Sequence, residues 1–215
     1  MLMPQSIEHK KLTVFDLDGT LLDYDSEEQA VSLELCRRLS ARCGKTAPEV
    51  LTTYKASKAA ARQLPSSADQ LDFRFQYLCT SLGIVLHDSS VLRQSYVACR
   101  VAACKPYAGA ERLAETFAAC SDHMAVLTNG PDDLQKLRLA ATGLDKYFGW
   151  VYTSQFIGYA KPDQRAFEYM QAERGVVPAE WRMVGDDPLA DLTVPKRLGA
   201  ETWWVNSDSR AVCQW

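Results

Sequence analysis

A series of short apolar runs, each ending in a polar loop, constrains the fold of this chain most strongly. The clearest run, 12–15, leads directly into Asp16, and two others end at Thr128 and Gly185. Segments with helical periodicity separate the runs, and alternation of strands with helices is typical of a parallel sheet covered on both faces. We therefore predict an α/β fold built on a doubly wound parallel sheet.

The ranges of these elements follow from the same patterns. Strands are predicted at 12–15, 124–127, 149–153, 181–184 and 202–205. Helices are predicted at 109–119, 132–141, 163–173 and about 191–198, the last with a late start at Pro195. Ligands of such sheets bind outside the carboxyl ends of the strands, so the polar loops are expected to meet at one edge.

The stretch 24–104 interrupts the alternation, because it offers successive helical patterns and no strand. Ser26 followed by Gln29 resembles a capping box at its first helix, and Lys105 with Pro106 is the predicted return point. We predict a helical cap domain over residues 24–104, inserted into a catalytic core formed by residues 1–23 and 105–215.

Charge and cysteine content restrict the partners and the compartment. The net charge is -3, the pI is near 5.7 and no basic patch is present, which argues against nucleic acid and membrane surfaces as partners. The first eleven residues hold no apolar stretch typical of a signal peptide. The seven cysteines form no CxxC pair, so we expect reduced, structural thiols and a cytoplasmic protein.

Asp16 and Asp18 follow the first strand and carry the first chemical signal. Two residues apart on extended backbone, they lie on the same side, while Gly19 permits a sharp turn and Thr20 supplies a hydroxyl. We expect Gly19 and Thr20 to contribute to binding of the phosphoryl group. A carboxylate can attack a phosphate ester if a cation offsets the charge and an acid protonates the leaving oxygen. An isolated D-x-D pair would also fit a solvated loop or a helix cap.

Two further polar elements occur later in the chain. Thr128, Asn129 and Gly130 offer a hydroxyl and successive backbone N–H groups that can hold phosphoryl oxygens, although a helix N-cap is an equal interpretation. Lys161, before Pro162, can place a compact positive charge on a phosphoryl group. Alone, it would be interpreted as a surface lysine.

A fourth element, Gly185 followed by Asp186 and Asp187, lies at the end of another predicted strand, and Asp191 follows it. Carboxylates suit Mg²⁺, which takes hard oxygen ligands. One acid is expected to bind metal, and the others to orient it through hydrogen bonds. An acidic loop that caps the next helix is the alternative.

Together and in this order, these elements resemble the haloacid dehalogenase superfamily in its phosphatase branch, and most closely the nucleotidases and small-metabolite phosphatases. The resemblance implies a Rossmann-like core with a small helical cap and a Mg²⁺ cofactor. It implies roles for five residues: Asp16 as nucleophile, Asp18 as acid/base, Thr128 and Lys161 as phosphoryl-binding groups, and Asp186 as a metal ligand. It also implies that the Asp16 carboxylate and the Asp18 carbonyl oxygen join the metal, with Asp187 and Asp191 beyond them.

The expected activity is Mg²⁺-dependent hydrolysis of a small phosphorylated metabolite, a nucleoside monophosphate among the candidates, by a monomer or homodimer. A phosphomutase would also keep both Asp16 and Asp18, whereas a dehalogenase would not need Asp18. A non-catalytic binding protein is a further alternative. Residues that could line the inner face of the cap are Tyr24, Lys58, Arg62, Phe73, Arg74 and Tyr77.

Overall fold

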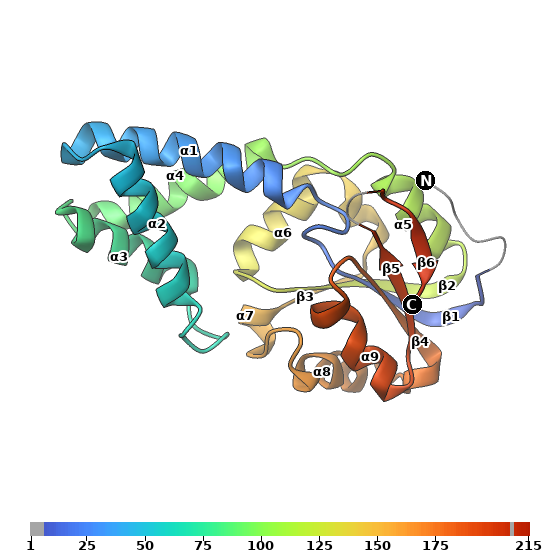
Figure 1. Ribbon diagram of the computed structural model, residues 1–215. Coiled ribbons are helices and arrows are strands. Elements are labelled where there is room, and N and C mark those ends of the chain that lie inside the picture. Colours follow the sequence, from blue (N-terminus) through green and yellow to red (C-terminus); the bar gives the residue numbers. More distant parts are fainter. Residues whose placement is uncertain (1–6, 207–208) are drawn as a thin grey trace.

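The computed structural model describes residues 7–206 and 209–215, and its centre is a six-stranded sheet (Figure 1). The strand order is β3-β2-β1-β4-β5-β6, and all neighbouring pairs are parallel except β5 with β6. The strands are β1 (Lys10–Phe15), β2 (Ser121–Thr128), β3 (Trp150–Thr153), β4 (Trp181–Gly185), β5 (Glu201–Val205) and β6 (Val212–Gln214). The predicted α/β fold with a parallel sheet is confirmed. The antiparallel edge strand β6 was not predicted.

Helices cover both faces of this sheet, because alternate residues of the buried strands point to opposite sides. Phe15 of β1 packs with Phe117 and Leu139 on one face, whereas Val14 packs with Phe167 and Met170 on the other. The helices of this part are α5 (Ala110–Ala118), α6 (Asp132–Ala141), α7 (Ser154–Ile157), α8 (Gln164–Arg174) and α9 (Thr193–Leu198).

Between β1 and α5 the chain forms a bundle of four helices beside the sheet (Figure 1). They are α1 (Tyr24–Cys43), α2 (Ala47–Ala61), α3 (Gln70–Leu82) and α4 (Asp88–Ala103). The bundle has an apolar core of its own, in which Leu39, Val50, Phe75 and Leu78 are fully buried. We refer to residues 24–104 as the cap. The two chain crossings lie together, since the Asp23 N–H donates to the Lys105 carbonyl oxygen at 3.0 Å.

Two helix starts differ from the prediction. Asp23, not Ser26, is the N-cap of α1, and its carboxylate accepts from the Ser26 N–H at 3.2 Å. The capping box assigned to Ser26 and Gln29 is therefore wrong, because the helix begins three residues earlier. After β4, a π-helical turn, η3 (Pro188–Leu192), precedes α9, and Pro195 lies within the first turn of α9.

None of the described helices is both long and apolar enough to cross a membrane. The seven cysteines are free thiols, and burial raises the pKa of Cys36 and Cys79 and raises that of Cys104 to about 11. These values fit thiols that pack as small apolar groups. Residues 1–6, on which the sequence argument about a signal peptide partly rests, lie outside the described residues.

Candidate active site

A cavity of about 620 Å³ lies at the carboxyl ends of the central strands, between the sheet and the cap. Asp16 follows β1, Thr128 ends β2 and Asp186 follows β4, so the parallel sheet brings three distant sequence elements together. The cavity is lined by Asp16, Asp18, Tyr24, Lys58, Ala61, Arg62, Leu64, Ser66, Gln70, Arg74, Thr128, Asn129, Gly130, Ser154, Ala160, Lys161, Asp186, Asp187, Ala190 and Asp191.

The buried lysine Lys161 is the centre of the charged floor of this cavity. Its ammonium donates to Asp16 Oδ1 at 2.6 Å and to Asp191 Oδ1 at 2.7 Å, and all three side chains are almost inaccessible to water. Asn129 holds the loop in place, because its amide oxygen and nitrogen bond the Lys161 N–H and carbonyl at 2.9 Å each. Lys161 is therefore an ordered cation in contact with Asp16.

Burial and mutual repulsion shift the ionisation of these groups. Burial raises the pKa of Asp16, and Lys161 opposes that rise while the carboxylates of Asp191 and Asp186 add to it. Burial acts to lower the pKa of Lys161, but Asp16 and Asp191 outweigh it and the pKa is raised. Burial also raises the pKa of Asp186, against a hydrogen bond from Thr20. The floor carries more negative charge than one lysine offsets, which favours an added cation.

Glycines allow the acidic loops to approach so closely. Gly19 has φ +89°, and a Cβ built there would overlap the Asp186 carboxylate. A Cβ at Gly185 would overlap the Asp191 side chain in the same way. Both positions exclude any larger residue while the acids keep these places.

The donor set fits a hard divalent cation. One carboxylate oxygen from each of Asp16, Asp186 and Asp191 lies within 4.8 Å of the others. Asp16 Oδ2 is buried and has no hydrogen-bond partner among the described residues, although an unpaired buried carboxylate oxygen is costly. A cation at this point would satisfy it. Asp191, predicted only to support the site, is the third member of this group, beside the two predicted carboxylate ligands Asp16 and Asp186.

Hydrogen bonds fix the position of Asp186. Thr20 donates its hydroxyl to Asp186 Oδ1 at 2.9 Å, and the Trp204 indole donates to the Asp186 carbonyl oxygen at 2.9 Å. Arg210 donates to the carbonyl oxygens of Gly19 and Thr20. Thr20 thus orients Asp186 in this structure, a different partner from the predicted phosphoryl group. Trp204 and Arg210 were not anticipated, because they lie far along the chain and match no motif.

The loop after β2 offers fewer free donors than predicted. Thr128 is buried and accepts from the Gln135 amide at 2.8 Å, which leaves its own hydroxyl proton for a ligand. The Gly130 N–H is already donated to the Ser154 hydroxyl at 2.9 Å. Thr128 is therefore the better placed phosphoryl donor of this loop, whereas Asn129 and Gly130 are used within the protein.

Asp18 has two partners that the sequence analysis missed. Arg138 donates to Asp18 Oδ1 at 2.6 Å and Gln135 donates to Oδ2 at 2.9 Å, both from α6. Arg138 is fully buried and also pairs with Glu27 of the cap at 2.7 Å. The only sequence signal was that Gln135 and Arg138 share a helix face with the buried Leu134 and Leu139.

Asp187 lies at the edge of the cavity, but its carboxylate serves the backbone. It accepts from the N–H groups of Leu189 and Ala190, so it caps η3.

The residues predicted to line the inner face of the cap do so in part. Of the six, Tyr24, Lys58, Arg62 and Arg74 line the cavity. Phe73 and Tyr77 do not line it, and their rings pack on each other at 6.2 Å.

The geometry and the order of these elements agree with a known family. The family described as haloacid dehalogenase-like hydrolase matches residues 13–205. The chain belongs to the haloacid dehalogenase-like hydrolases. The resemblance inferred from the sequence, and with it the prediction of a hydrolase, is confirmed.

Relatives within the family differ in what they are named for. Phosphoserine phosphatase of Thermus thermophilus is 39% identical over 87 residues, which are 40% of this chain and only 35% of that protein. Pyrimidine 5'-nucleotidase PynA of Streptococcus pneumoniae is 28% identical over 91% of this chain and 84% of its own length. The crystal structure of a haloacid dehalogenase-type phosphatase from Thermococcus onnurineus has a TM-score of 0.70 and 25% identity, covering 94% of this chain and 88% of that one.

Proposed function

We propose that this protein is a magnesium-dependent phosphatase that transfers the phosphoryl group of a small phosphomonoester to Asp16. The observation that carries the proposal is the state of the Asp16 carboxylate. Lys161 holds one oxygen at 2.6 Å and the other is buried and unpartnered, while the carboxylate as a whole groups with those of Asp186 and Asp191. Relatives named as phosphatases and a nucleotidase support the same reaction class.

Asp16, Asp186 and Asp191 would hold the Mg²⁺ ion, together with backbone oxygen such as the Asp18 carbonyl predicted from the sequence. When bound, the ion supplies positive charge that offsets repulsion between the carboxylates and a phosphate. Asp187 stays outside this set, because its carboxylate caps η3. The protein's own cation, Lys161, adds charge from the opposite side of Asp16.

In the first step an Asp16 oxygen bonds to phosphorus, the ester P–O bond breaks, and Asp18 gives a proton to the leaving oxygen. In the second step water attacks the aspartyl phosphate and gives its proton to Asp18, which releases phosphate and restores Asp16. Lys161 and Thr128 bind the phosphoryl oxygens through both steps. For the proton transfers, one Asp18 oxygen has to face the cavity rather than Gln135 or Arg138.

The cavity supports a small substrate rather than a polymer, since its volume of about 620 Å³ is typical of small-molecule sites. We propose a phosphorylated metabolite, acted on by a monomer or homodimer in the cytoplasm. The two relatives are named for different substrates, phosphoserine and pyrimidine nucleotides, so a nucleoside monophosphate is one candidate among others.

The test is hydrolysis of p-nitrophenyl phosphate with Mg²⁺ and with excess chelator. We expect turnover only with Mg²⁺, none in Asp16→Asn, and acid-stable incorporation of one phosphoryl group on Asp16 by mass spectrometry. Asp145→Asn, at a solvent-exposed position of the core domain, is the matched control and should keep full activity. Release of free phosphate separates a phosphatase from a mutase. Turnover that survives in folded Asp16→Asn would refute the proposal.

A further inference from the structure

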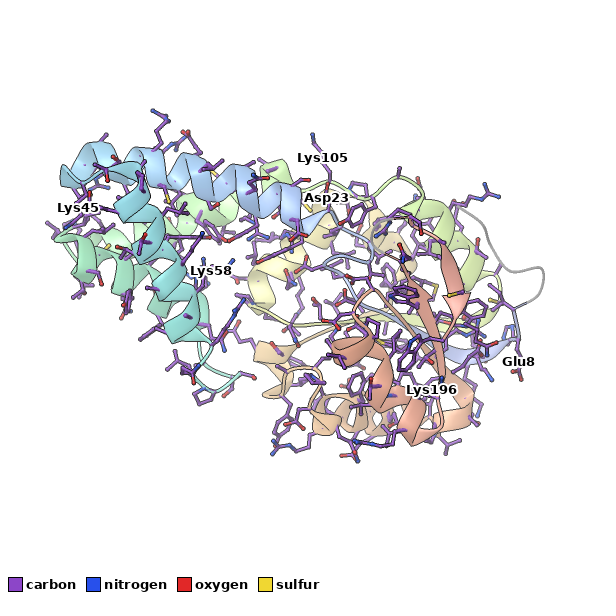
Figure 2. The ribbon with its side chains drawn as sticks, in the orientation of Figure 1. Glu8, Asp23, Lys45, Lys58, Lys105 and Lys196 are labelled. Carbon is purple, nitrogen blue, oxygen red and sulfur yellow. The ribbon has the colours of Figure 1, made fainter. Side chains whose placement is uncertain are left out.

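The wall of the cavity opposite Asp16 is formed by the cap and is positively charged. Lys58 and Arg62 come from the end of α2, and Arg74 comes from α3. Figure 2 shows Lys58 on the side of α2 that faces the core. A substrate whose phosphoryl group lies at Asp16 would extend toward these residues.

Most charges on this wall already have partners within the protein. Glu28 is fully engaged, since one oxygen accepts from Lys58 at 2.6 Å and Tyr54 at 2.7 Å. Its other oxygen accepts from Arg100 and from Tyr96 at 2.9 Å. Lys58 and Arg100 are thus ion-paired, and Glu28 has no oxygen left for a further cation.

Two cations of this wall have no ion pair among the described residues, the exposed Arg62 and the more buried Arg74. No carboxylate in the described part of the chain lies within ion-pair distance of the Arg74 guanidinium, and its Nε and Nη2 atoms are buried without a hydrogen-bond partner. The guanidinium instead lies over the rings of Tyr54 and Tyr96, at 5.1 Å and 5.4 Å from their centroids. Buried donors without acceptors are costly, so an anion reaching this wall would gain strong, charge-assisted hydrogen bonds.

The same wall offers little to a nucleobase. Tyr24 is the one aromatic residue among the described residues that line the cavity. Its ring already lies near three cations, Arg100 at 5.0 Å and Lys58 and Arg138 at 5.8 Å each. A base would therefore compete with these cations for the Tyr24 ring, whereas an acidic group finds a cation without an ion pair.

We infer that the substrate carries a second acidic group, a carboxylate or second phosphate, which Arg74 binds at the cap wall of the cavity. The inference rests on the proposed phosphatase function and narrows its substrate class to small phosphomonoesters with two anionic ends. Arg62, which also lines the cavity, adds positive charge at the same wall. Arg74 is then a specificity residue, not a residue of the reacting centre.

Kinetics with a matched pair of substrates tests this inference. We expect wild-type protein to prefer 2-phosphoglycolate over 2-hydroxyethyl phosphate, which lacks the carboxylate. Arg74→Gln should lower kcat/KM for 2-phosphoglycolate by about 10- to 100-fold and change that for the neutral ester less than about threefold. Arg74→Lys should lie between, and Arg37→Gln, an equal charge change elsewhere on the cap, should match wild type. An equal loss on both substrates would show a purely structural role and overturn the inference.

Binding of stable analogues separates this inference from the proposed function, because it needs no turnover. Titration calorimetry would compare 3-phosphonopropionate and 1,3-propanebisphosphonate with propylphosphonate in wild type, Arg74→Gln and Arg74→Lys. Tighter binding of either diacid in wild type, lost in Arg74→Gln, supports the inference, and the better diacid names the acidic group. Equal binding of all three probes in wild type overturns it. Hydrolysis of p-nitrophenyl phosphate with no diacid preference would leave the phosphatase proposal intact.

Discussion

At the scale of single residues, Asp186 and Asp187 are adjacent but have separate roles. Asp186 faces Asp16 and Asp191, and Thr20 and Trp204 hold it there. Asp187 turns to the backbone of η3 and satisfies two N–H groups at its start. Removing a carboxylate that binds the metal lowers the affinity of the protein for the metal ion, whereas removing a carboxylate that caps a helix lowers only the stability of that helix.

We therefore expect Mg²⁺ to stabilise the protein through Asp186 and not through Asp187. At 100 times its Kd, an ion that binds only the native state adds about 2.7 kcal/mol to the free energy of unfolding. Asp186→Asn should lose most of this gain, while Asp187→Asn should keep it because asparagine also caps helices. Thermal unfolding with Mg²⁺ and with chelator measures both. A normal Mg²⁺ response in Asp186→Asn would exclude it as a ligand.

Arg138 gives a second prediction at this scale, because it pairs with both Asp18 and the buried Glu27. Removing one partner of a buried ion pair costs about 3–5 kcal/mol, so Arg138→Gln should be strongly destabilised. In Arg138→Gln the Glu27 carboxylate keeps only its pair with Arg100. The double variant Glu27→Gln with Arg138→Gln should regain part of that stability, since this half-paired Glu27 charge is gone and Arg100 keeps Glu28. Its kcat should stay low, because Asp18 still lacks its donor. Recovery of kcat together with stability would show that Arg138 acts only on folding.

The sequence predicted the residues at strand ends but not those that position them. Asp16 and Asp186 could be predicted because a buried strand followed by a polar loop is a local pattern, whereas the role of Lys161 followed only from the family resemblance. Arg138, Gln135 and Trp204 act across the fold, and their partners are about 20 to 120 positions away. Such contacts depend on which helix face meets which loop, and a single sequence does not encode that in any local pattern.

At the scale of elements, the first cap helix depends on how it begins. The Asp23 carboxylate accepts from the Ser26 N–H, and its backbone N–H bonds Lys105 at the other chain crossing. The sequence prediction placed the N-cap of this helix at Ser26, because serine followed by glutamine three positions later fits a capping box. Asp23 is the N-cap instead, because the helix begins at the chain crossing itself, where the chain leaves the core.

Asp23→Ala should lower the free energy of unfolding by about 1 kcal/mol, the usual cost of losing an N-cap. Asp23→Asn should be nearly neutral, because its amide oxygen accepts the same hydrogen bond. Urea denaturation followed by circular dichroism measures both variants, and Ser26→Ala is the control that the capping-box hypothesis would rank as the costlier change. A larger loss of unfolding free energy in Ser26→Ala than in Asp23→Ala would contradict the assignment of Asp23 as the N-cap.

At the scale of the whole molecule, buried charges join the cap to the core. Glu27 of α1 contacts Arg138 of α6, and Arg100 of α4 contacts both Glu27 and Glu28. Arg93 of α4 adds an exposed pair to Asp133 of α6 at 2.9 Å. The contact between the two parts thus combines these ion pairs with apolar packing of Leu134 of α6 in the core of the cap, and the ion pairs should depend on pH where their carboxylates titrate.

The partners of Glu28 among the described residues all lie within the cap, so Glu28 gives the cap itself a pH-dependent stability. Burial acts to raise its pKa, but Arg100 and Lys58, with a hydrogen bond from Tyr54, outweigh burial and lower the pKa to about 2. Tyr96 also donates to it. A carboxyl with a lowered pKa in the folded state stabilises that state above its unfolded value, 4.5, and the stabilisation is lost as pH falls toward about 2.

We expect wild type to lose up to about 3 kcal/mol of unfolding free energy between about pH 5 and pH 2 relative to Glu28→Gln. Above that window, Glu28→Gln should be the less stable protein, because Arg100 and Lys58 lose their charged partner. Urea unfolding across this pH range measures the difference, with Glu168→Gln, at an exposed position on α8, as the control for net charge. A difference between wild type and Glu28→Gln that does not change with pH would show that Glu28 keeps an ordinary pKa in the folded protein and does not stabilise the cap as the ionised partner of Arg100 and Lys58.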